Sequence, residues 1–441
     1  MTLLTYIVGF ITLIMVITAI HEAGHYSVAR FFKVTILDFS IGMGKSLKSW
    51  KDSSNTEFHI RALPIGGFVR MKGEDESQSS KDSFSSKKYY QKVLILLAGP
   101  IANFVLAIIL LTGLNIYGNS SLSSLVGYVE ENSPSYDAGF QEGDLILEID
   151  SYRVFTRSDA QMALSRRLGE TGNINFLMLS DNSQKSLDIS IESWLQGEEP
   201  SDLLRHLGIN IPIKPIVGQV LVDSPADVAG LRANDEIMEI NNELVSSWSE
   251  IKGKINNNLG LPASFKIKRE DKIIFLSVSP KFSDESKEWL VGISASNKIS
   301  PEALIYQRDN PLNALMKASI QTYNVINDSF EFLYKMLTGY VSPKNLGGPV
   351  MIGQFAGESL IYGGLYSFIL LIGYVSIGLG VINLVPIPIL DGGQILILSI
   401  ERIKGSPISP KILDFTYRFG ISAVVLLMIF AFMNDISRIG V

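Results

Sequence analysis

Residues 3–25 read LLTYIVGFITLIMVITAIHEAGH, a long apolar run that ends in a cluster of ionisable side chains. The run from Leu3 to Ile20 holds eighteen uncharged residues, which would form about 27 Å of helix. That length approaches the ~30 Å hydrocarbon core of a bilayer, so the run predicts a transmembrane helix. Ionisable groups at the end of a span are costly and usually mark a functional site.

The cluster itself, His21-Glu22-Ala23-Gly24-His25, has the H-E-x-x-H spacing. Because residues four apart share one face of a helix, both imidazoles can reach one metal ion, with Glu22 beside it. Two histidines and one carboxylate form a known catalytic zinc set that leaves a fourth position open for water. We therefore predict that His21 and His25 bind Zn²⁺ and that Glu22 acts as the general base. The alternative is that these side chains only meet lipid headgroups.

A third ligand is predicted at Asp391, in the stretch NLVPIPILDGG at residues 383–393. A span that enters from the other side of the membrane would reach Asp391 near the depth of the histidines. Two prolines and two glycines interrupt the helix there, and broken backbone at membrane depth needs protein or a water-filled cavity to satisfy it. Asp391 as the cap of a restarted helix is an alternative role that is compatible with metal binding.

The remaining composition favours a membrane protein with soluble modules, since 46% of the 441 residues are hydrophobic and 19% are charged. Uncharged stretches predict four spans, in segments 1–32, 93–118, 362–400 and 419–441. The intervening segments 33–92 and 401–418 are rich in Lys and Arg, which places them in the cytoplasm by the positive-inside rule. Both termini and residues 119–361 would then face outward.

Two function classes are disfavoured by composition. Cysteine is absent, which excludes thiolate metal ligands, cysteine catalysis and disulfides. The net charge of −6 gives no sign of a nucleic-acid partner.

The outward segment contains an internal repeat, because a shift of 91 residues aligns Val126-Gly127 with Val217-Gly218. Further along, Ser133-Pro134 meets Ser224-Pro225, and the Asp-x-Ile pattern at Asp144 recurs at Asp235. The duplicated modules, 119–211 and 212–300, resemble PDZ domains, which bind extended peptides or C-termini by strand addition. A pair of spacers without a ligand is the alternative interpretation.

The segment 301–361 is predicted to be a linker that includes an amphipathic helix. Apolar residues recur at helical spacing between Pro311 and Tyr340. This helix could lie on the outer membrane surface or pack on the second module.

These motifs together resemble the site-2 protease family. The resemblance rests on HEAGH, the Asn383–Gly393 stretch, the paired PDZ-like modules, GPIAN at 99–103 and LPIGGFVRM at 63–71. It implies an α-helical polytopic membrane protein with four transmembrane helices, a membrane-associated β-hairpin within 33–92 and two periplasmic PDZ domains. It also implies substrate contacts by Asn383 and by the hairpin glycines, which are Gly42, Gly44, Gly66 and Gly67.

The family resemblance further implies a task in the bacterial inner membrane, with the active site near the cytoplasmic face. The substrates would be single-pass membrane proteins that a periplasmic protease has already trimmed. An anti-sigma factor of the envelope stress response is the main expectation, and remnant signal peptides are the second. The outer modules would act as a size filter against substrates with bulky ectodomains.

Two rival functions come from other classes. One is a PDZ-bearing membrane scaffold with a non-catalytic zinc site, but such a site does not need Glu22. The other is a metal-ion transporter, which would place polar residues in several spans, whereas the second and fourth spans offer almost none.

Overall fold

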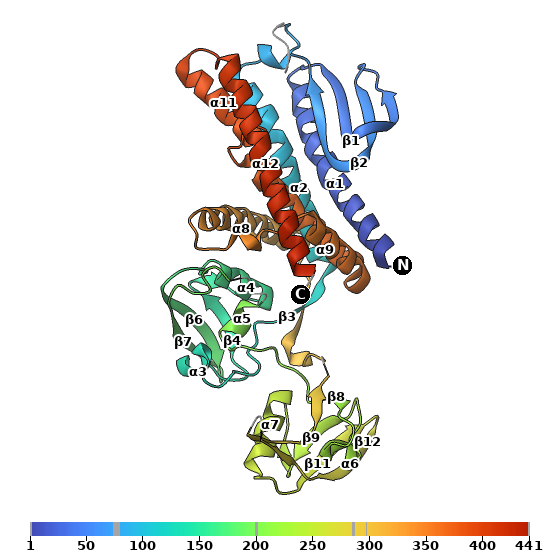
Figure 1. The fold of residues 1–441 in the computed structure, drawn as a ribbon, viewed down its shortest axis with the longest axis vertical. Helices are drawn as coiled ribbons and strands as arrows, with labels where there is room; N and C mark the ends of the chain where they lie inside the picture. Colours follow the sequence, from blue (N-terminus) through green and yellow to red (C-terminus); the bar gives the residue numbers. More distant parts are fainter. Residues whose placement is uncertain (1, 74–79, 199–201, 285–286, 297, 440–441) are drawn as a thin grey trace. The chain divides into compact units, whose positions relative to one another are not determined.

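The computed structural model describes residues 2–73, 80–198, 202–284, 287–296 and 298–439 (Figure 1). Residue 1 begins the predicted segment 1–32, and residues 440 and 441 end the predicted segment 419–441. All three lie outside the described residues. The chain forms two compact units. One comprises Met1–Asn119 with Arg308–Val441, and the other comprises Ser120–Gln307.

The first unit is mostly helical. Its helices are α1 (Thr2–Phe31), α2 (Tyr89–Tyr117), α8 (Pro311–Leu337), α9 (Pro349–Tyr362), α10 (Gly364–Leu384), α11 (Asp391–Lys404) and α12 (Pro410–Ile439), with short 3₁₀ turns at Phe84–Ser86 and Pro343–Asn345. Within the described residues, four helices are long and apolar enough to cross a membrane, namely α1, α2, α10 and α12. The prediction of four apolar helices of spanning length is therefore confirmed.

One predicted helix break is confirmed and one predicted boundary differs. The interruption predicted within residues 383–393 separates α10, which ends at Leu384, from α11, which begins at Asp391, so the predicted segment 362–400 contains two helices. Pro386 and Pro388 lie between them, and proline can neither donate a helical hydrogen bond nor fit within a continuing helix. Helix α12 begins at Pro410, inside the predicted loop 401–418, since proline is well accommodated at the first helical position.

The spanning helices pack through a small apolar core. Leu13 and Ile17 of α1 lie buried against Phe368 and Ile372 of α10, with Ala356 of α9 completing the cluster. Because lipid is as apolar as these side chains, the association depends on close packing and on polar contacts between helices. One such contact holds α12, whose buried Asp435 accepts hydrogen bonds from three backbone amides at the start of α9 (2.8–3.0 Å).

Helix α8 packs against α2 and α10. Its Val325, Ile326 and Leu333 contact a buried cluster that includes Ala107 of α2 and Ile377 of α10. The helix was predicted from its apolar spacing, but its packing partners were not. The spacing shows which face of the helix is buried, but it does not show which other helices that face contacts.

Strands β1 (Ile36–Lys51) and β2 (Glu57–Met71) form an antiparallel sheet beside α1 (Figure 1). Asp38 pairs with both Glu57 and Arg70, and Phe39 pairs with both Phe58 and Val69. The first half of β1 is therefore flanked on both sides by parts of β2, so the predicted hairpin folds back on itself. A buried cluster that includes Phe39 and Val69 joins this sheet to Ala29 of α1.

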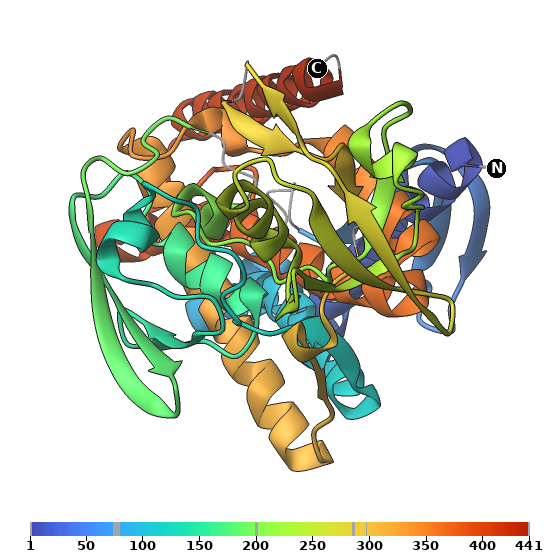
Figure 2. The ribbon, with the colours of Figure 1, turned by 90° about the horizontal axis from the view of Figure 1, so that it is seen from below.

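The second unit contains two modules with the same strand order. In Figure 2 the first module is coloured teal to green and the second olive to yellow. The first has the strand order β5-β4-β6-β7 and the second has the order β10-β9-β11-β12. The strands of the first sheet are β4 (Leu145–Ile149), β5 (Tyr152–Arg153), β6 (Gly172–Ser180) and β7 (Ser183–Ile191). Those of the second are β9 (Glu236–Ile240), β10 (Glu243–Leu244), β11 (Ala263–Arg269) and β12 (Lys272–Val278).

The sequence repeat also explains the local structure of the modules. Ser133 and Ser224 each cap a short helix that begins with proline. Each hydroxyl oxygen accepts a hydrogen bond from a backbone amide nitrogen 3.2 Å away. The duplication predicted from the 91-residue shift is confirmed by these matching elements. These two helices are α3 (Pro134–Ala138) and α6 (Pro225–Val228), and the described residues of the unit also form α4 (Arg157–Ser165), α5 (Leu203–His206), α7 (Trp248–Asn257) and a 3₁₀ turn at Pro301–Ala303. Short paired strands complete it, namely β3 (Asn119–Leu122) with β16 (Leu304–Gln307), β8 (Val217–Val220) with β15 (Ile293–Ala295), and β13 (Lys281–Ser283) with β14 (Glu288–Leu290).

Candidate metal centre and active site

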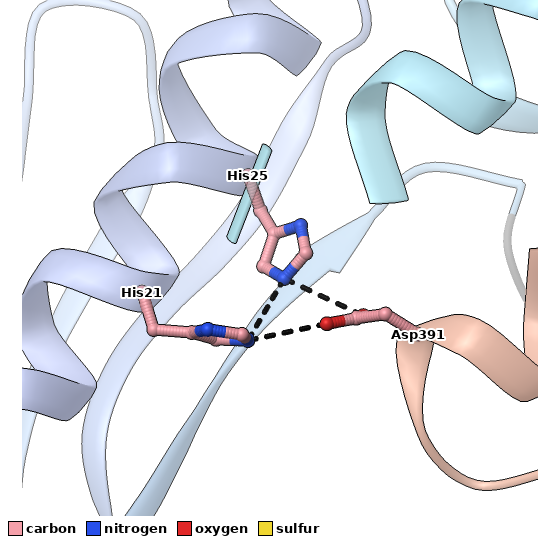
Figure 3. A group of neighbouring side chains, drawn as sticks. All are labelled: His21, His25 and Asp391. Carbon is pink, nitrogen blue, oxygen red and sulfur yellow. Dashed lines mark hydrogen bonds and ion pairs between the residues drawn. The ribbon is translucent and has the colours of Figure 1, made fainter. Parts of the chain in front are cut away.

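Three predicted ligand side chains meet at one point between α1 and α11 (Figure 3). His21 Nε2 lies 3.2 Å from His25 Nε2 and 3.3 Å from Asp391 Oδ2. His25 Nε2 lies 3.5 Å from Asp391 Oδ1. Both histidines are buried, and the Asp391 side chain is only 13% exposed. The structure thus brings together residues that are 370 positions apart in the chain, from 21 to 391.

The geometry fits a tetrahedral zinc ion. Bonds of about 2.0–2.1 Å at tetrahedral angles place neighbouring ligand atoms about 3.3 Å apart, and each of the three side chains approaches the other two to 3.2–3.5 Å, His21 and His25 through different oxygens of Asp391. Asp391 Oδ2 is also buried without a hydrogen-bond partner among the described residues. A buried oxygen of this kind is costly unless it binds a cation or a donor, so the donor set suits a metal ion.

Helices α1 and α2 cross closely at this site because each helix has a glycine at the crossing point, Gly24 in α1 and Gly99 in α2. A Cβ at Gly24 would lie 2.3 Å from the Ala98 carbonyl oxygen of α2. A Cβ at Gly99 would lie 2.3 Å from His25 Nε2 and 2.7 Å from His21 Cε1. Both positions therefore require the absence of a side chain, and the two imidazole rings lie directly against the α2 backbone.

The α2 backbone also orients one imidazole. His25 Nδ1 lies 2.8 Å from the Ile95 carbonyl oxygen. A carbonyl can only accept, so the Nδ1 nitrogen carries the proton and Nε2 keeps the lone pair that a metal ion needs.

Asp391 is placed by the break between α10 and α11. It is the first residue of α11, where the helix dipole favours a negative charge. The glycines that follow allow α11 to start close to the connecting segment. A Cβ at Gly392 would lie 2.2 Å from the Leu384 carbonyl oxygen, and one at Gly393 would lie 2.0 Å from that of Ile387.

The other predicted site residues divide into two groups. Glu22 is buried next to His21 on α1, and a Cβ at Gly67 of β2 would lie 3.0 Å from Glu22 Cγ, so the sheet lies against the predicted base. Asn383 at the end of α10 places its Nδ2 3.4 Å from His21 Nε2. Gly42, Gly44 and Gly66 instead have positive φ values of 84°, 81° and 70°, which suits them to the bends of the folded-back hairpin.

A second group of potential ligands lies in the sheet, where His59 contacts Asp38 (3.4 Å) and Glu57 (3.5 Å). Both carboxylates already have cationic partners, since Arg70 pairs with Asp38 and Lys51 lies 2.7 Å from Glu57. This cluster is a network of ion pairs within the sheet.

Sequence reasoning did not assign roles to Gly24, Gly99 or Asn103. Asn103 is fully buried, and its Nδ2 lies 3.3 Å from His21 Nδ1. The available signal was a polar amide in an apolar span at the depth of the H-E-x-x-H motif.

Comparison with known proteins agrees with this geometry. The sequence model of peptidase family M50 matches residues 9–427. Regulator of sigma-E protease RseP from Salmonella typhimurium is 30% identical over 452 residues, and protease RseP from Yersinia pestis is 33% identical over 458 residues. Both alignments cover 100% of each chain. A Pasteurella multocida protein that carries a zinc metalloprotease name is 30% identical over 450 residues, again with 100% coverage of both chains.

A solved PDZ domain of an SdrC-like protein from Listeria monocytogenes aligns with 20% of this chain and 90% of its own length. Its sequence identity is 24% and its TM-score is 0.18, so this match adds nothing to the strand order described above. The family match and the full-length relatives are decisive. The chain belongs to peptidase family M50, the site-2 protease family of zinc metalloproteases.

Proposed function

We propose that His21, His25 and Asp391 hold the zinc ion and that Glu22 is the general base for cleavage of a peptide bond at membrane depth. The observation that carries this proposal is the meeting of three ligand side chains, with one ligand atom from each lying within 4.8 Å of the others, between the apolar helix α1 and the start of α11. Zinc supplies an electrophile that polarises the scissile carbonyl and lowers the pKa of the attacking water toward about 7.

The protein residues have distinct tasks in this scheme. Glu22 accepts a proton from the attacking water and passes it to the leaving amine. Asn383, whose amide lies 3.4 Å from His21 Nε2, donates to the substrate backbone. The substrate segment unwinds and pairs as a strand with the edge of the β1–β2 sheet, whose Gly67 lies beside Glu22. This arrangement exposes a carbonyl that a helical substrate would hide.

The membrane arrangement follows from charge. The Lys- and Arg-rich segments 33–92 and 401–418 lie in the cytoplasm, so the active site is near the cytoplasmic face of the bacterial inner membrane. The two repeated modules, 119–211 and 212–300, are PDZ domains on the periplasmic side, as are both termini. The matching strand order of the modules supports this assignment.

The substrates are single-pass membrane proteins that have lost their bulky ectodomains. Relatives that match over the full chain are named regulators of sigma-E protease. We therefore assign an anti-sigma factor as the main substrate, whose cleavage releases a sigma factor for the envelope stress response. Remnant signal peptides are a second substrate class.

Glu22→Gln tests the catalytic assignment. The change removes the proton acceptor and leaves the three metal ligands in place, so zinc content should stay at the wild-type level. Cleavage of a membrane-segment substrate by the purified protein should fall by about 10²–10⁴-fold. Wild-type turnover in this variant would overturn the role of Glu22 as the general base. Absence of cleavage by the zinc-loaded wild-type protein would instead favour the alternative of a PDZ-bearing scaffold with a non-catalytic zinc site.

Deletion of residues 125–300 tests the filter role of the modules. The modules form a unit separate from the metal ligands, so no ligand is lost. The truncated enzyme should cleave a substrate with an intact ectodomain, while its rate on a trimmed substrate changes little. Matched long and short substrates in vesicles provide the comparison. A folded, zinc-loaded truncation that cuts neither substrate would show that the modules assemble the active site instead.

A further inference from the structure

Asn103 lies at the back of the metal centre, on α2, one helical turn beyond Gly99. Its side chain is fully buried and points at His21, with a separation of 3.3 Å between Asn103 Nδ2 and His21 Nδ1. Its backbone carbonyl accepts a hydrogen bond from Ser376 Oγ of α10 at 3.0 Å. The residue is thus held between two helices, and its side chain cannot turn toward solvent.

The metal-facing nitrogen of His21 can be identified from its neighbours. His21 Nε2 lies 3.2 Å from His25 Nε2 and 3.3 Å from Asp391 Oδ2, so Nε2 points into the donor set. An imidazole that binds a metal is neutral and carries its single proton on the other nitrogen. That Nδ1–H group normally donates to an acceptor behind the ring, which fixes the tautomer. For His25 the acceptor is the Ile95 carbonyl oxygen.

The group found at His21 Nδ1 is the carboxamide of Asn103, and its oxygen lacks a partner. Asn103 Oδ1 is buried with no hydrogen bond among the described residues, while Nδ2 faces His21. The two ends of a carboxamide have nearly the same shape, and which end is oxygen is assigned from the hydrogen-bond network. A half-turn of the amide places Oδ1 where it accepts the proton of His21 Nδ1.

We propose that Asn103 is a positioning residue whose carboxamide oxygen accepts the Nδ1–H of His21 and so keeps the Nε2 lone pair directed at zinc. This inference rests on the proposed ligand set. It makes α2 the source of both acceptors behind the histidines, a backbone carbonyl for His25 and a side chain for His21.

Two variants separate acceptor chemistry from shape. Asn103→Leu keeps the approximate size of the side chain and removes the acceptor, so zinc affinity measured by chelator competition should fall by about 10–100-fold. Asn103→Asp keeps an oxygen in place and should retain affinity within about threefold of wild type. Asn115→Leu is the matched control, because Asn115 is on the same helix about 18 Å away and should not affect zinc affinity.

Nitrogen-15 NMR of histidine-labelled protein gives a second readout that a purely structural role would not change. The chain has only four histidines, so the His21 signal can be assigned by substitution. In the zinc-loaded wild type His21 should carry its proton on Nδ1, and a signal showing protonation at Nε2 would overturn the inference even if Asn103→Leu fails to fold. Wild-type zinc affinity in folded Asn103→Leu, or an equal loss in Asn103→Asp, would also overturn it.

Control variants at the ligands distinguish this inference from the proposed function. If His25→Ala and Asp391→Ala both keep wild-type zinc affinity, the ligand set itself is wrong. If both lose zinc while folded Asn103→Leu does not, the ligand set stands and only the role of Asn103 fails.

Discussion

Substitution of Gly99 by alanine should damage the metal centre although Gly99 is not a ligand. The new Cβ would lie 2.3 Å from His25 Nε2 and 2.7 Å from His21 Cε1, and ordinary contacts for such an atom begin at 3.4 Å. The closest ring atom must therefore move by roughly 1 Å, or the α1–α2 crossing must open by a similar amount. In either case the two imidazoles leave their present positions.

The size of the effect follows from the tolerance of metal sites. Ligand distances must stay within about 0.2 Å of their ideal values, so a shift of about 1 Å is several times too large. Misplacement by about 1 Å costs on the order of 10²-fold in rate even where chemistry is otherwise intact. We expect zinc affinity and cleavage to fall together by about 100-fold or more, and overpacking to destabilise the fold by about 1–3 kcal/mol.

Gly113→Ala on the same helix is the matched control, because a Cβ there would meet no atom within 4 Å. Alanine is a better helix former than glycine by about 0.5–1 kcal/mol, so this variant should be as stable as wild type or slightly more stable. The assays are zinc titration against a chelator, cleavage of a trimmed substrate and thermal unfolding in detergent. Wild-type zinc affinity in Gly99→Ala would refute the close-approach reasoning.

Two further predictions concern other helices. Asp391→Asn should lower zinc occupancy and cleavage together, because the carboxylate is assigned as a ligand and neutralises part of the metal charge; full occupancy with full activity would remove Asp391 from the site. Asp435→Ala should lower the free energy of unfolding by about 1–3 kcal/mol, because it leaves three buried or partly buried amides at the start of α9 without their acceptor. Zinc stoichiometry should be unchanged in that variant, and an unaltered melting curve would show that α12 is held by other contacts.

The meeting of the three proposed metal ligands could be predicted from sequence because each lies in a strong local pattern. His21 and His25 share a helix face by their spacing, and the apolar run before them fixes their depth. Asp391 could be matched to that depth because its own span is uninterrupted until the prolines. Long apolar runs and a repeated Ser-Pro pattern can likewise be recognised in the sequence without knowledge of the tertiary structure.

The helix partners could not be predicted in the same way. The segment containing α9 reads as a linker, yet its Gly357 allows Tyr6 of α1 to pack against its backbone. The double pairing of Asp38 with Glu57 and Arg70 also could not be predicted from the sequence, because the alternation of side chains along a strand does not specify how a hairpin folds back. These features depend on which surfaces meet in three dimensions.

The clearest case is α2, which supplies none of the proposed ligands and yet lies directly behind both histidines. Ile95, Gly99 and Asn103 are spaced by four, so they lie near one another on one face of the helix. The carbonyl oxygen of Ile95 contacts His25, and the side-chain amide of Asn103 contacts His21. Gly99, which has no side chain, leaves room for both imidazole rings. Each contribution is of a different chemical kind, which is why no hydrophobic or charge pattern reveals the set. Substitutions along this face should therefore appear first as defects in zinc binding.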